Sequence, residues 1–226
     1  MQWEVIQGDC LDLLRDIPTA TIDAIVTDPP YGINTKSDGT GKLNPWADLC
    51  NAALWYATWI RECRRIIKPT GCLWSFLNWR SLPTFQKAAC DIGWPIESLL
   101  VWDKEWIGPG GPRGLRPSYE MVALWPGSEF SVGDRGLADV QAFKWCGHKP
   151  TGHPAEKPVS LLAWLLDASN VGVGGSVLDP FTGSGSTGVA AVQCGATFTG
   201  CEIDGAWCAS ARRRIADAVP LTSEVA

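Results

Sequence analysis

Hydrophobic residues along this chain occur in two patterns: short continuous runs, and longer stretches in which they recur every three or four positions. The short runs predict seven strands, at residues 3–7, 22–27, 72–77, 95–102, 119–125, 177–179 and 196–203. The longer stretches predict amphipathic helices, at residues 10–17, 46–67, 81–92, 158–169, 185–194 and 206–219. Strands that alternate with helices indicate an α/β layer structure.

Three stretches between these elements are rich in Gly, Pro and polar residues, and we expect them to be loops. Residues 32–45 follow a candidate site and are a candidate lid or DNA-contacting segment, although a plain surface loop has the same composition. Residues 103–118 carry arginines and a tryptophan, which suit a phosphate backbone or a solvated linker. Residues 126–152 are expected to be irregular.

The strand at residues 22–27 ends at Asp28, which is followed by Pro29 and Pro30. Two successive prolines cannot continue the ladder of backbone hydrogen bonds between strands, because each lacks a backbone N–H and fixes φ at about −65°. The chain must therefore leave the sheet in a stiff turn that presents the Asp28 carboxylate, a carbonyl acceptor and the Tyr31 ring. Open α/β sheets bind ligands at this end of a strand, although an ordinary strand-ending turn would also fit the pattern.

A second strand ends in a glycine-rich loop. Asp179-Pro180-Phe181 precedes a Gly-x-Gly-x-x-Gly pattern formed by Gly183, Gly185 and Gly188, and a predicted helix follows. Glu202 stands nineteen residues after Gly183, at the end of the next predicted strand. An acidic residue at this spacing accepts hydrogen bonds from ribose hydroxyls. The context therefore indicates a cofactor that contains a nucleoside.

NAD and S-adenosylmethionine are the two alternatives for that cofactor. A dinucleotide fold needs a second set of strands, and 24 residues follow Glu202. The carboxylate of Asp179 would repel a pyrophosphate but can pair with an ammonium group. S-adenosylmethionine carries an α-ammonium and a ribose but no phosphate, so it matches the charges better.

Bulk composition narrows the protein class. The chain has 226 residues, of which 46% are apolar and 19% charged, so we expect one folded domain rather than disorder. It shows no membrane-length apolar run and no signal-peptide character, which favours a soluble cytosolic protein. Nine cysteines without a Cys-x-x-Cys pair, and two histidines, argue against disulfides and a zinc site. The net charge of −5 counts mildly against nucleic acid, although basic residues cluster at Arg61, Arg64, Arg65 and Lys68.

The two motifs together resemble the DNA amino-methyltransferases, which methylate the exocyclic amine of adenine or cytosine. Their order resembles the β class, because Asp28-Pro29-Pro30-Tyr31 comes first and the Asp179–Gly185 segment lies near the C-terminus. Gly8-Asp9-Cys10 resembles the family segment that contacts the cofactor adenine. The segment from His153 to Pro158 resembles the element whose lysine, here Lys157, approaches the methionine carboxylate.

Further matches extend the resemblance to nearly the whole chain, since Trp102-Asp103-Lys104 and Tyr119-Glu120 resemble the central strands of the family. The resemblance implies a three-layer, Rossmann-like methyltransferase fold with a seven-stranded, mostly parallel sheet and a permuted motif order. It implies a single domain over residues 1–226, with a catalytic half at 1–125 and a cofactor-binding half at 153–226. The variable segment at 126–152 is short for target recognition.

The resemblance also implies the roles of individual residues. The expected catalytic residues are Asp28, Pro29, Pro30 and Tyr31. The expected cofactor-binding residues are Asp9, Cys10, Asp28, Lys157, Asp179, Pro180, Phe181, Gly183, Gly185 and Glu202, and no metal is expected.

The implied activity is methyl transfer from S-adenosylmethionine to the N6 amine of adenine in flipped-out DNA. Asp rather than Ser at position 28 resembles the adenine enzymes, while cytosine-N4 transfer remains the main alternative. RNA or a protein amine is a rival substrate, and an NAD oxidoreductase or a non-catalytic DNA-binding module is a remote rival. The implied partner is DNA, in a bacterial or phage-encoded cytoplasmic setting. Because related enzymes often dimerise, a homodimer is left open as a partner, and so is a companion restriction endonuclease.

Overall fold

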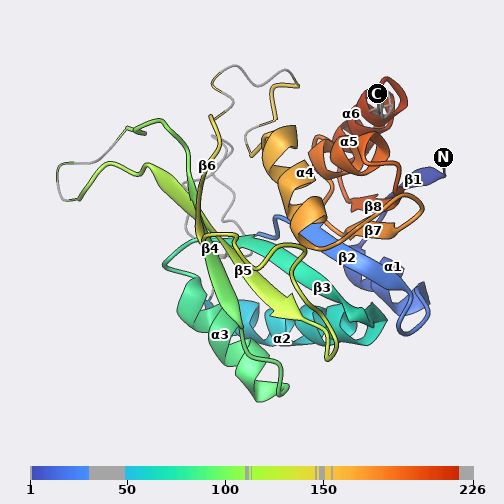
Figure 1. The fold of residues 1–226 in the computed structure, drawn as a ribbon, viewed down its shortest axis with the longest axis horizontal. Helices are drawn as coiled ribbons and strands as arrows, with labels where there is room; N and C mark the ends of the chain where they lie inside the picture. The colour runs from blue at the N-terminus through green and yellow to red at the C-terminus, as the bar shows by residue number, and fades with distance from the viewer. Residues whose placement is uncertain are drawn as a thin grey trace.

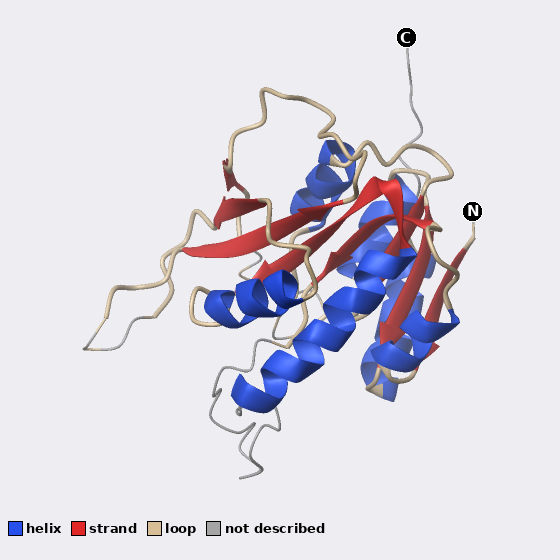
Figure 2. Cartoon of the chain, turned by 90° about the horizontal axis from the view of Figure 1, so that it is seen from below, coloured by secondary structure: helices blue, strands red, loops and turns tan. Residues whose placement is uncertain are grey.

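The computed structural model of the chain describes residues 2–30, 49–109, 112, 114–145, 147, 151–153 and 155–218, without the side chains of residues 49–52. Figure 1 shows a central twisted sheet with helices packed on both of its faces. Figure 2 shows the long helix α2 (Leu49–Ile66) crossing one of those faces. The α/β layer structure predicted from the sequence is therefore confirmed.

The described residues form one eight-stranded sheet, in the order β1-β8-β7-β2-β3-β5-β4-β6. β5 runs antiparallel to both of its neighbours, β3 and β4, and the other pairs are parallel. The strands are β1 (Trp3–Gln7), β2 (Ile22–Thr27), β3 (Ile67–Leu77), β4 (Ser98–Asp103), β5 (Tyr119–Pro126), β6 (Val140–Ala142), β7 (Ser176–Asp179) and β8 (Thr197–Glu202).

Of the helices that the structure describes, three cover each face of this sheet. α1 (Cys10–Asp16), α2 and α3 (Leu82–Asp91) share one apolar core with one set of strand side chains. α4 (Val159–Ala168), α5 (Ser186–Gln193) and α6 (Gly205–Ala216) share a second core with the other set. Among the described helices, none is long and apolar enough to cross a membrane.

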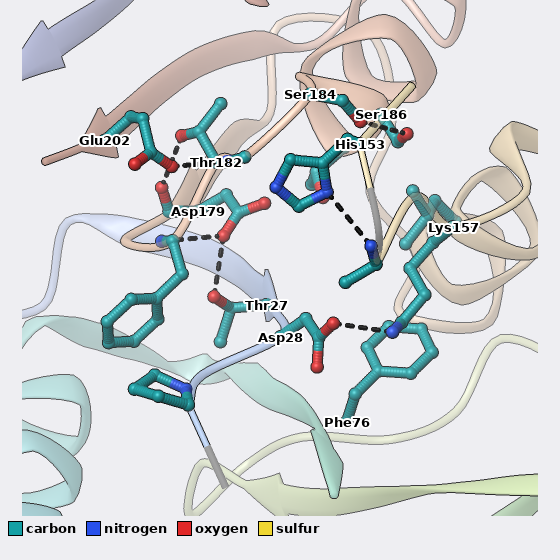
Figure 3. A pocket seen from close by; sticks show the side chains of 16 residues that line it. Thr27, Asp28, Phe76, His153, Lys157, Asp179, Thr182, Ser184, Ser186 and Glu202 are labelled. Carbon is teal, nitrogen blue, oxygen red and sulfur yellow. Dashed lines mark hydrogen bonds and ion pairs between the residues drawn. The ribbon is translucent and has the colours of Figure 1, made fainter. Parts of the chain in front are cut away.

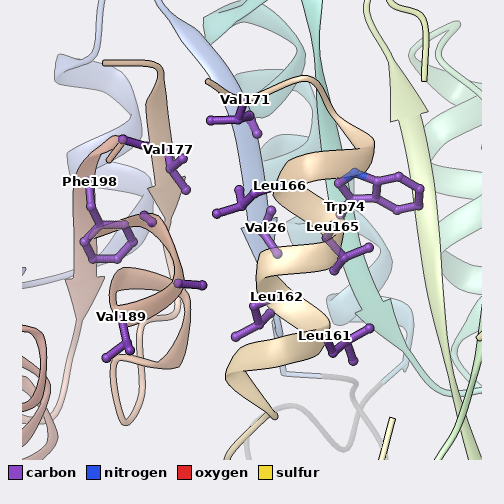
Figure 4. Packing of buried hydrophobic residues seen from close by; sticks show 14 of the residues in the cluster. Val26, Trp74, Leu161, Leu162, Leu165, Leu166, Val171, Val177, Val189 and Phe198 are labelled. Carbon is purple, nitrogen blue, oxygen red and sulfur yellow. The ribbon is translucent and has the colours of Figure 1, made fainter. Parts of the chain in front are cut away.

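The central strands are continuous apolar runs because both of their faces are buried. In β2, Ala24 and Val26 face the α4 side, while Ile25 between them faces the α2 side. The leucines of α4 fill the space above β2 and β3 beside Val26 and Trp74, as Figure 4 shows. Alternating side chains therefore hold the two helical layers against one sheet.

The prediction of seven strands is wrong, because β6 adds an eighth within the 126–152 segment that was expected to be irregular. β6 has three residues and pairs in parallel with β4 at the edge of the sheet. A strand this short leaves no periodic pattern in the sequence, since backbone hydrogen bonds define it. Other boundaries also move, because β4 begins at Ser98 and β3 follows α2 directly at Ile67.

The strand order places β7 and β8, from the end of the chain, between β1 and β2. From β7 the chain crosses through α5 to β8 on one side, and from β2 it crosses through α2 to β3 on the other. Connections that leave in opposite directions open a crevice at the carboxyl ends of the two strands. Asp28 follows β2 and Asp179 ends β7, so the fold brings both predicted motifs to this crevice.

Candidate active site

A pocket of about 250 Å³ lies at the carboxyl ends of β2, β7 and β8. Figure 3 shows side chains from the N-terminal and C-terminal parts of the chain converging on it. Its described lining comprises Thr27, Asp28, Pro30, Phe76, His153, Ala155, Lys157, Leu162, Asp179, Phe181, Thr182, Gly183, Ser184, Ser186, Thr187 and Glu202.

Asp179 joins the two halves of the pocket. Its carboxylate accepts a hydrogen bond of 2.6 Å from the Thr27 hydroxyl at the end of β2, and another of 3.0 Å from the Phe181 backbone N–H. The side chain is buried, and burial raises the pKa of Asp179 to about 6 against the hydrogen bonds that favour its ionised form. Thr27 is thus a site residue that the sequence analysis missed, because its partner is 152 positions away.

The glycine-rich loop turns tightly beside Asp179. Gly183 and Gly185 have φ angles of +51° and +83°, in the left-handed region that glycine adopts without strain. The Gly183 N–H donates to one Glu202 carboxylate oxygen at 2.8 Å, and the Asp204 N–H donates to the other at 2.9 Å. Glu202 therefore anchors the loop as well as lining the pocket, and a carboxylate has further acceptor positions for a ligand.

Two elements hold the glycine loop in place. A Cβ on Gly183 would lie 3.1 Å from the imidazole of His153, so a larger residue would require that side chain to shift. Arg214 of α6 donates to Ser184 and Ser186 and pairs with the buried carboxylate of Glu156 at 2.9 Å. No local pattern indicates this role of Arg214, because a run of three arginines near the end of a helix is typical of a solvated face.

The turn after β2 is fixed by a neighbouring helix. The hydroxyl of Tyr56, in α2, donates a hydrogen bond to the Pro30 carbonyl. Tyr56 is fully buried, and Pro29 is also buried, so the turn is packed against the α2 layer. Tyr31 and the 32–45 loop lie outside the described residues, so their predicted roles stay predictions.

Asp28 forms an ion pair with Lys157, with 2.5 Å between Oδ2 and Nζ. Lys157 also lies 3.1 Å from Glu120, and Glu120 lies 2.6 Å from Lys104. Burial lowers the pKa of Lys157, but the Asp28 and Glu120 carboxylates outweigh it, so the net shift is upward. Lys157 was expected beside the cofactor, and its contacts here are to the turn after β2 and to β5.

Four other predicted cofactor residues do not belong to the described lining of the pocket. Asp9 caps α1 by accepting a 2.7 Å hydrogen bond from the Leu11 N–H. Cys10 is buried, and burial raises the pKa of its thiol to about 12. Pro180 and Gly185 shape the glycine loop without lining the pocket. The roles assigned to these four residues therefore stay predictions.

The charges of the pocket indicate what kind of ligand it can bind. Among its described lining residues are three carboxylates, Asp28, Asp179 and Glu202, and one lysine, which Asp28 already pairs. A pyrophosphate would meet repulsion here, whereas a cationic group would be attracted. Phe181 adds an aromatic wall that packs on Trp55 and Trp59 of α2. The residues therefore fit a cationic nucleoside such as S-adenosylmethionine better than NAD. No group of three His, Cys, Asp or Glu side chains in the described residues could hold a metal ion.

Comparisons with known proteins agree with this geometry. A family model of the N6/N4 methyltransferases, described as DNA methylase, matches residues 22–213. YubD of Escherichia coli (strain K12) is 32% identical over 204 residues, which cover 88% of this chain and 83% of YubD. The DNA adenine methyltransferase YhdJ of the same strain is 26% identical over 93% of this chain and 82% of its own length.

Solved structures share the fold. The M1.HpyAVI complex with S-adenosylmethionine has a TM-score of 0.72 at 20% identity, and covers 95% of this chain and 99% of its own. The cytosine-N4-specific PvuII DNA methyltransferase has a TM-score of 0.77 at 15% identity, over 95% of this chain and 86% of its own. The Rossmann-like methyltransferase fold that the sequence predicted is therefore confirmed, with eight strands in place of seven.

We predict that Asp179→Asn stabilises the fold at pH 8 but not at pH 4. The folded-state pKa of Asp179, about 6, lies above its ordinary value of 3.8, so the wild type loses stability as the pH rises through this window. An amide carries no charge and its Oδ1 can still accept from Thr27 and Phe181. The free energy of unfolding should rise by about 2 to 3 kcal/mol at pH 8, measured by urea unfolding at both pH values.

The control is Asp12→Asn, which removes an exposed carboxylate on α1. It should leave the pH dependence of unfolding unchanged. An equal gain from Asp179→Asn at pH 4 and pH 8 would show that the carboxylate is not destabilised by burial.

Proposed function

Because this chain belongs to the N6/N4 DNA methylase family, we propose that it transfers a methyl group from S-adenosylmethionine to the exocyclic N6 amine of adenine in DNA. The observation that carries the proposal is the pairing of β2 with β7, which places the Asp28 turn and the Asp179 loop on one pocket. The adenine preference is supported by the likeness to YhdJ and by the carboxylate at position 28.

S-adenosylmethionine suits the acidic pocket, and M1.HpyAVI, which shares the fold, has been solved with it. When bound, it supplies an electrophilic methyl group on a sulfonium sulfur. In this chain we assign Asp179 to its ammonium, Glu202 to its ribose hydroxyls and Phe181 to the face of its adenine. Each assignment uses a group that lines the pocket, and the first two place acceptors against donors.

Asp28 and Pro29 provide the acceptors for the target amine. An exocyclic amine is a poor nucleophile, because its lone pair is delocalised into the ring. Hydrogen bonds from the two amino hydrogens to the Asp28 carboxylate and the Pro29 carbonyl favour a pyramidal nitrogen with an available lone pair. The gain comes from positioning and from a negative charge beside an amine that becomes cationic. Asp28 therefore acts as a fixed acceptor rather than as a strong base.

The target base must leave the duplex to reach a pocket at the ends of buried strands. Tyr31 follows the turn directly in the sequence, and we assign it to stacking on the flipped base. Cytosine-N4 transfer is the second candidate, because the same two acceptors serve either amine and the PvuII enzyme shares the fold.

We predict that DNA incubated with the protein and S-adenosylmethionine yields N6-methyladenine. Digestion to nucleosides and mass spectrometry identifies the product, and parallel reactions with single-stranded DNA and RNA test the substrate. N4-methylcytosine would replace the adenine proposal with the second candidate, and methylated RNA alone would overturn the DNA assignment.

Asp28→Ala is expected to abolish methyl transfer while retaining cofactor binding, which should weaken far less than the rate falls. The substitution removes an acceptor for the amine and keeps Asp179, Glu202 and Phe181, which are assigned above to the ammonium, ribose and adenine of the cofactor. Radiolabel transfer measures the first effect and calorimetry with S-adenosylmethionine the second. Asp12→Ala, at an exposed position, should keep both properties. Turnover close to wild type in Asp28→Ala would exclude the assigned role.

Glu202→Ala should weaken binding of adenosine by about tenfold, because the carboxylate accepts from the ribose hydroxyls. The variant also loses the anchor to Gly183, so the comparison needs a ligand without those hydroxyls. Wild type should discriminate strongly between adenosine and 2′,3′-dideoxyadenosine in calorimetry, and Glu202→Ala should not. Undiminished discrimination in the variant would assign Glu202 to the loop alone.

A further inference from the structure

Four charged side chains of alternating sign form a continuous chain beside the pocket, and the inner two, Lys157 and Asp28, line it. Lys104 follows β4, Glu120 lies in β5, Lys157 precedes α4 and Asp28 follows β2. The successive nitrogen–oxygen distances are 2.6, 3.1 and 2.5 Å. The two oxygens of Glu120 each face a different ammonium group, so this residue links the outer lysine to the inner one.

The surroundings make these charges interact strongly. The side chains of Lys157 and Asp28 are 10% and 17% exposed, and those of Lys104 and Glu120 are 14% and 25% exposed. The Lys157 ammonium lies 4.8 Å from the centre of the Phe76 ring, and Lys104 lies 5.3 Å from that of Trp102. The low exposure and the two aromatic rings limit the access of water to these charges, so Coulomb interactions among them are less screened than at an open surface.

Burial alone would raise the pKa of Glu120, but Lys157 and then Lys104 lower it, so the net shift is downward. Asp179, at the end of β7, is another acidic group of the pocket, and burial raises its pKa to about 6. Two lysines and two carboxylates therefore sum to zero charge when all four are ionised. The removal of one carboxylate leaves a net positive charge beside the pocket.

We propose that Glu120 is a positioning residue for methyl transfer, which balances the charge of Lys157 so that Asp28 meets the target amine as an effective negative acceptor. The proposal rests on the proposed function. An ammonium 2.5 Å from Asp28 offsets the charge of its carboxylate. Glu120 in turn offsets the charge of that ammonium and holds it in place, so that the buried ammonium is not left with unbalanced charge.

The reaction explains why this balance matters. The amine nitrogen forms a bond to the methyl carbon as the carbon–sulfur bond breaks, with its electron pair left on sulfur. The nitrogen is cationic until it loses a proton to water. A pocket wall with net positive charge would oppose both the cationic cofactor and the cationic nitrogen. Glu120 thus acts on the reaction through Lys157, without contacting the substrate.

The test begins with Glu120→Gln, which keeps the shape of the side chain and removes its charge. We expect kcat for DNA methylation to fall at least about tenfold. Because Lys157 loses one of its two carboxylate partners, its pKa falls, and its deprotonation removes the surplus positive charge, so kcat of the variant should recover in part as the pH rises, whereas the wild type should show no such rise. Asp91→Asn, which breaks the exposed Lys87–Asp91 pair, is the matched control and should change neither kcat nor its pH dependence.

A second variant separates charge from structure. Glu120→Gln combined with Lys104→Met returns the sum of charges to zero, so it should recover most of the lost rate. A purely structural role for Glu120 predicts that the double variant is as slow as the single one or slower. That result would overturn the proposal, as would a single variant with wild-type kcat and pH profile.

Unfolding experiments test the interaction of Glu120 with Lys157 without relying on methyl transfer, so failure of the inference can be told apart from failure of the proposed function. In the wild type, the stability that Lys157 contributes is present below its unfolded pKa of about 10.4 and is lost as the pH rises through its raised folded pKa. Glu120→Gln lowers the folded pKa of Lys157, so less of this stability is present at pH 8 and the loss is complete at lower pH, and urea unfolding between pH 8 and pH 11 measures the difference. Coincident curves would overturn the inference even if the wild type methylates DNA. Separate curves with no methylation by the wild type would instead reject the proposed function.

Discussion

The parallel pairing of β2 with β7 is the constraint on which the rest of the site depends. It sets strands from the two ends of the chain side by side, in a register that aligns Ala24 with Val177 and Ile25 with Leu178. The strands therefore end together, and the Thr27 hydroxyl meets the Asp179 carboxylate across the join. Because β2 and β7 lead to crossovers in opposite directions, a crevice opens at the carboxyl ends of these two strands.

Charge is the second organising feature of the crevice. Its carboxylates suit a cationic cofactor and an amine that becomes cationic, but carboxylates that are buried together destabilise a fold. The protein meets this conflict in two ways. Asp179 accepts hydrogen bonds from Thr27 and Phe181, which stabilise its buried carboxylate. Its pKa is also raised, so protonation relieves part of the free-energy cost of burying the charge as the pH falls. Asp28 is instead paired with Lys157, whose own charge is shared with Glu120.

The sequence predicted the layer structure and most of its elements, because buried strands and amphipathic helices leave periodic patterns. It failed at β6, which is three residues long and consists of backbone hydrogen bonds to β4. It also extended α2 into residues that begin β3, since Ile67 suits either element. The role of Arg214 was not predicted, because nothing near it in the chain indicates Ser186 or the buried Glu156 as its partners.

The sequence by itself determined the two motifs, their order and the kind of chemistry they offer, since prolines, glycines and acidic residues act on the backbone and ligand around them. The tertiary structure decided which charges meet. Lys157 lies 129 positions from Asp28, and pairs with it because α4 docks over β2 and β3. Contacts of this kind depend on the packing of whole layers rather than on spacing along the chain, so no local pattern encodes them.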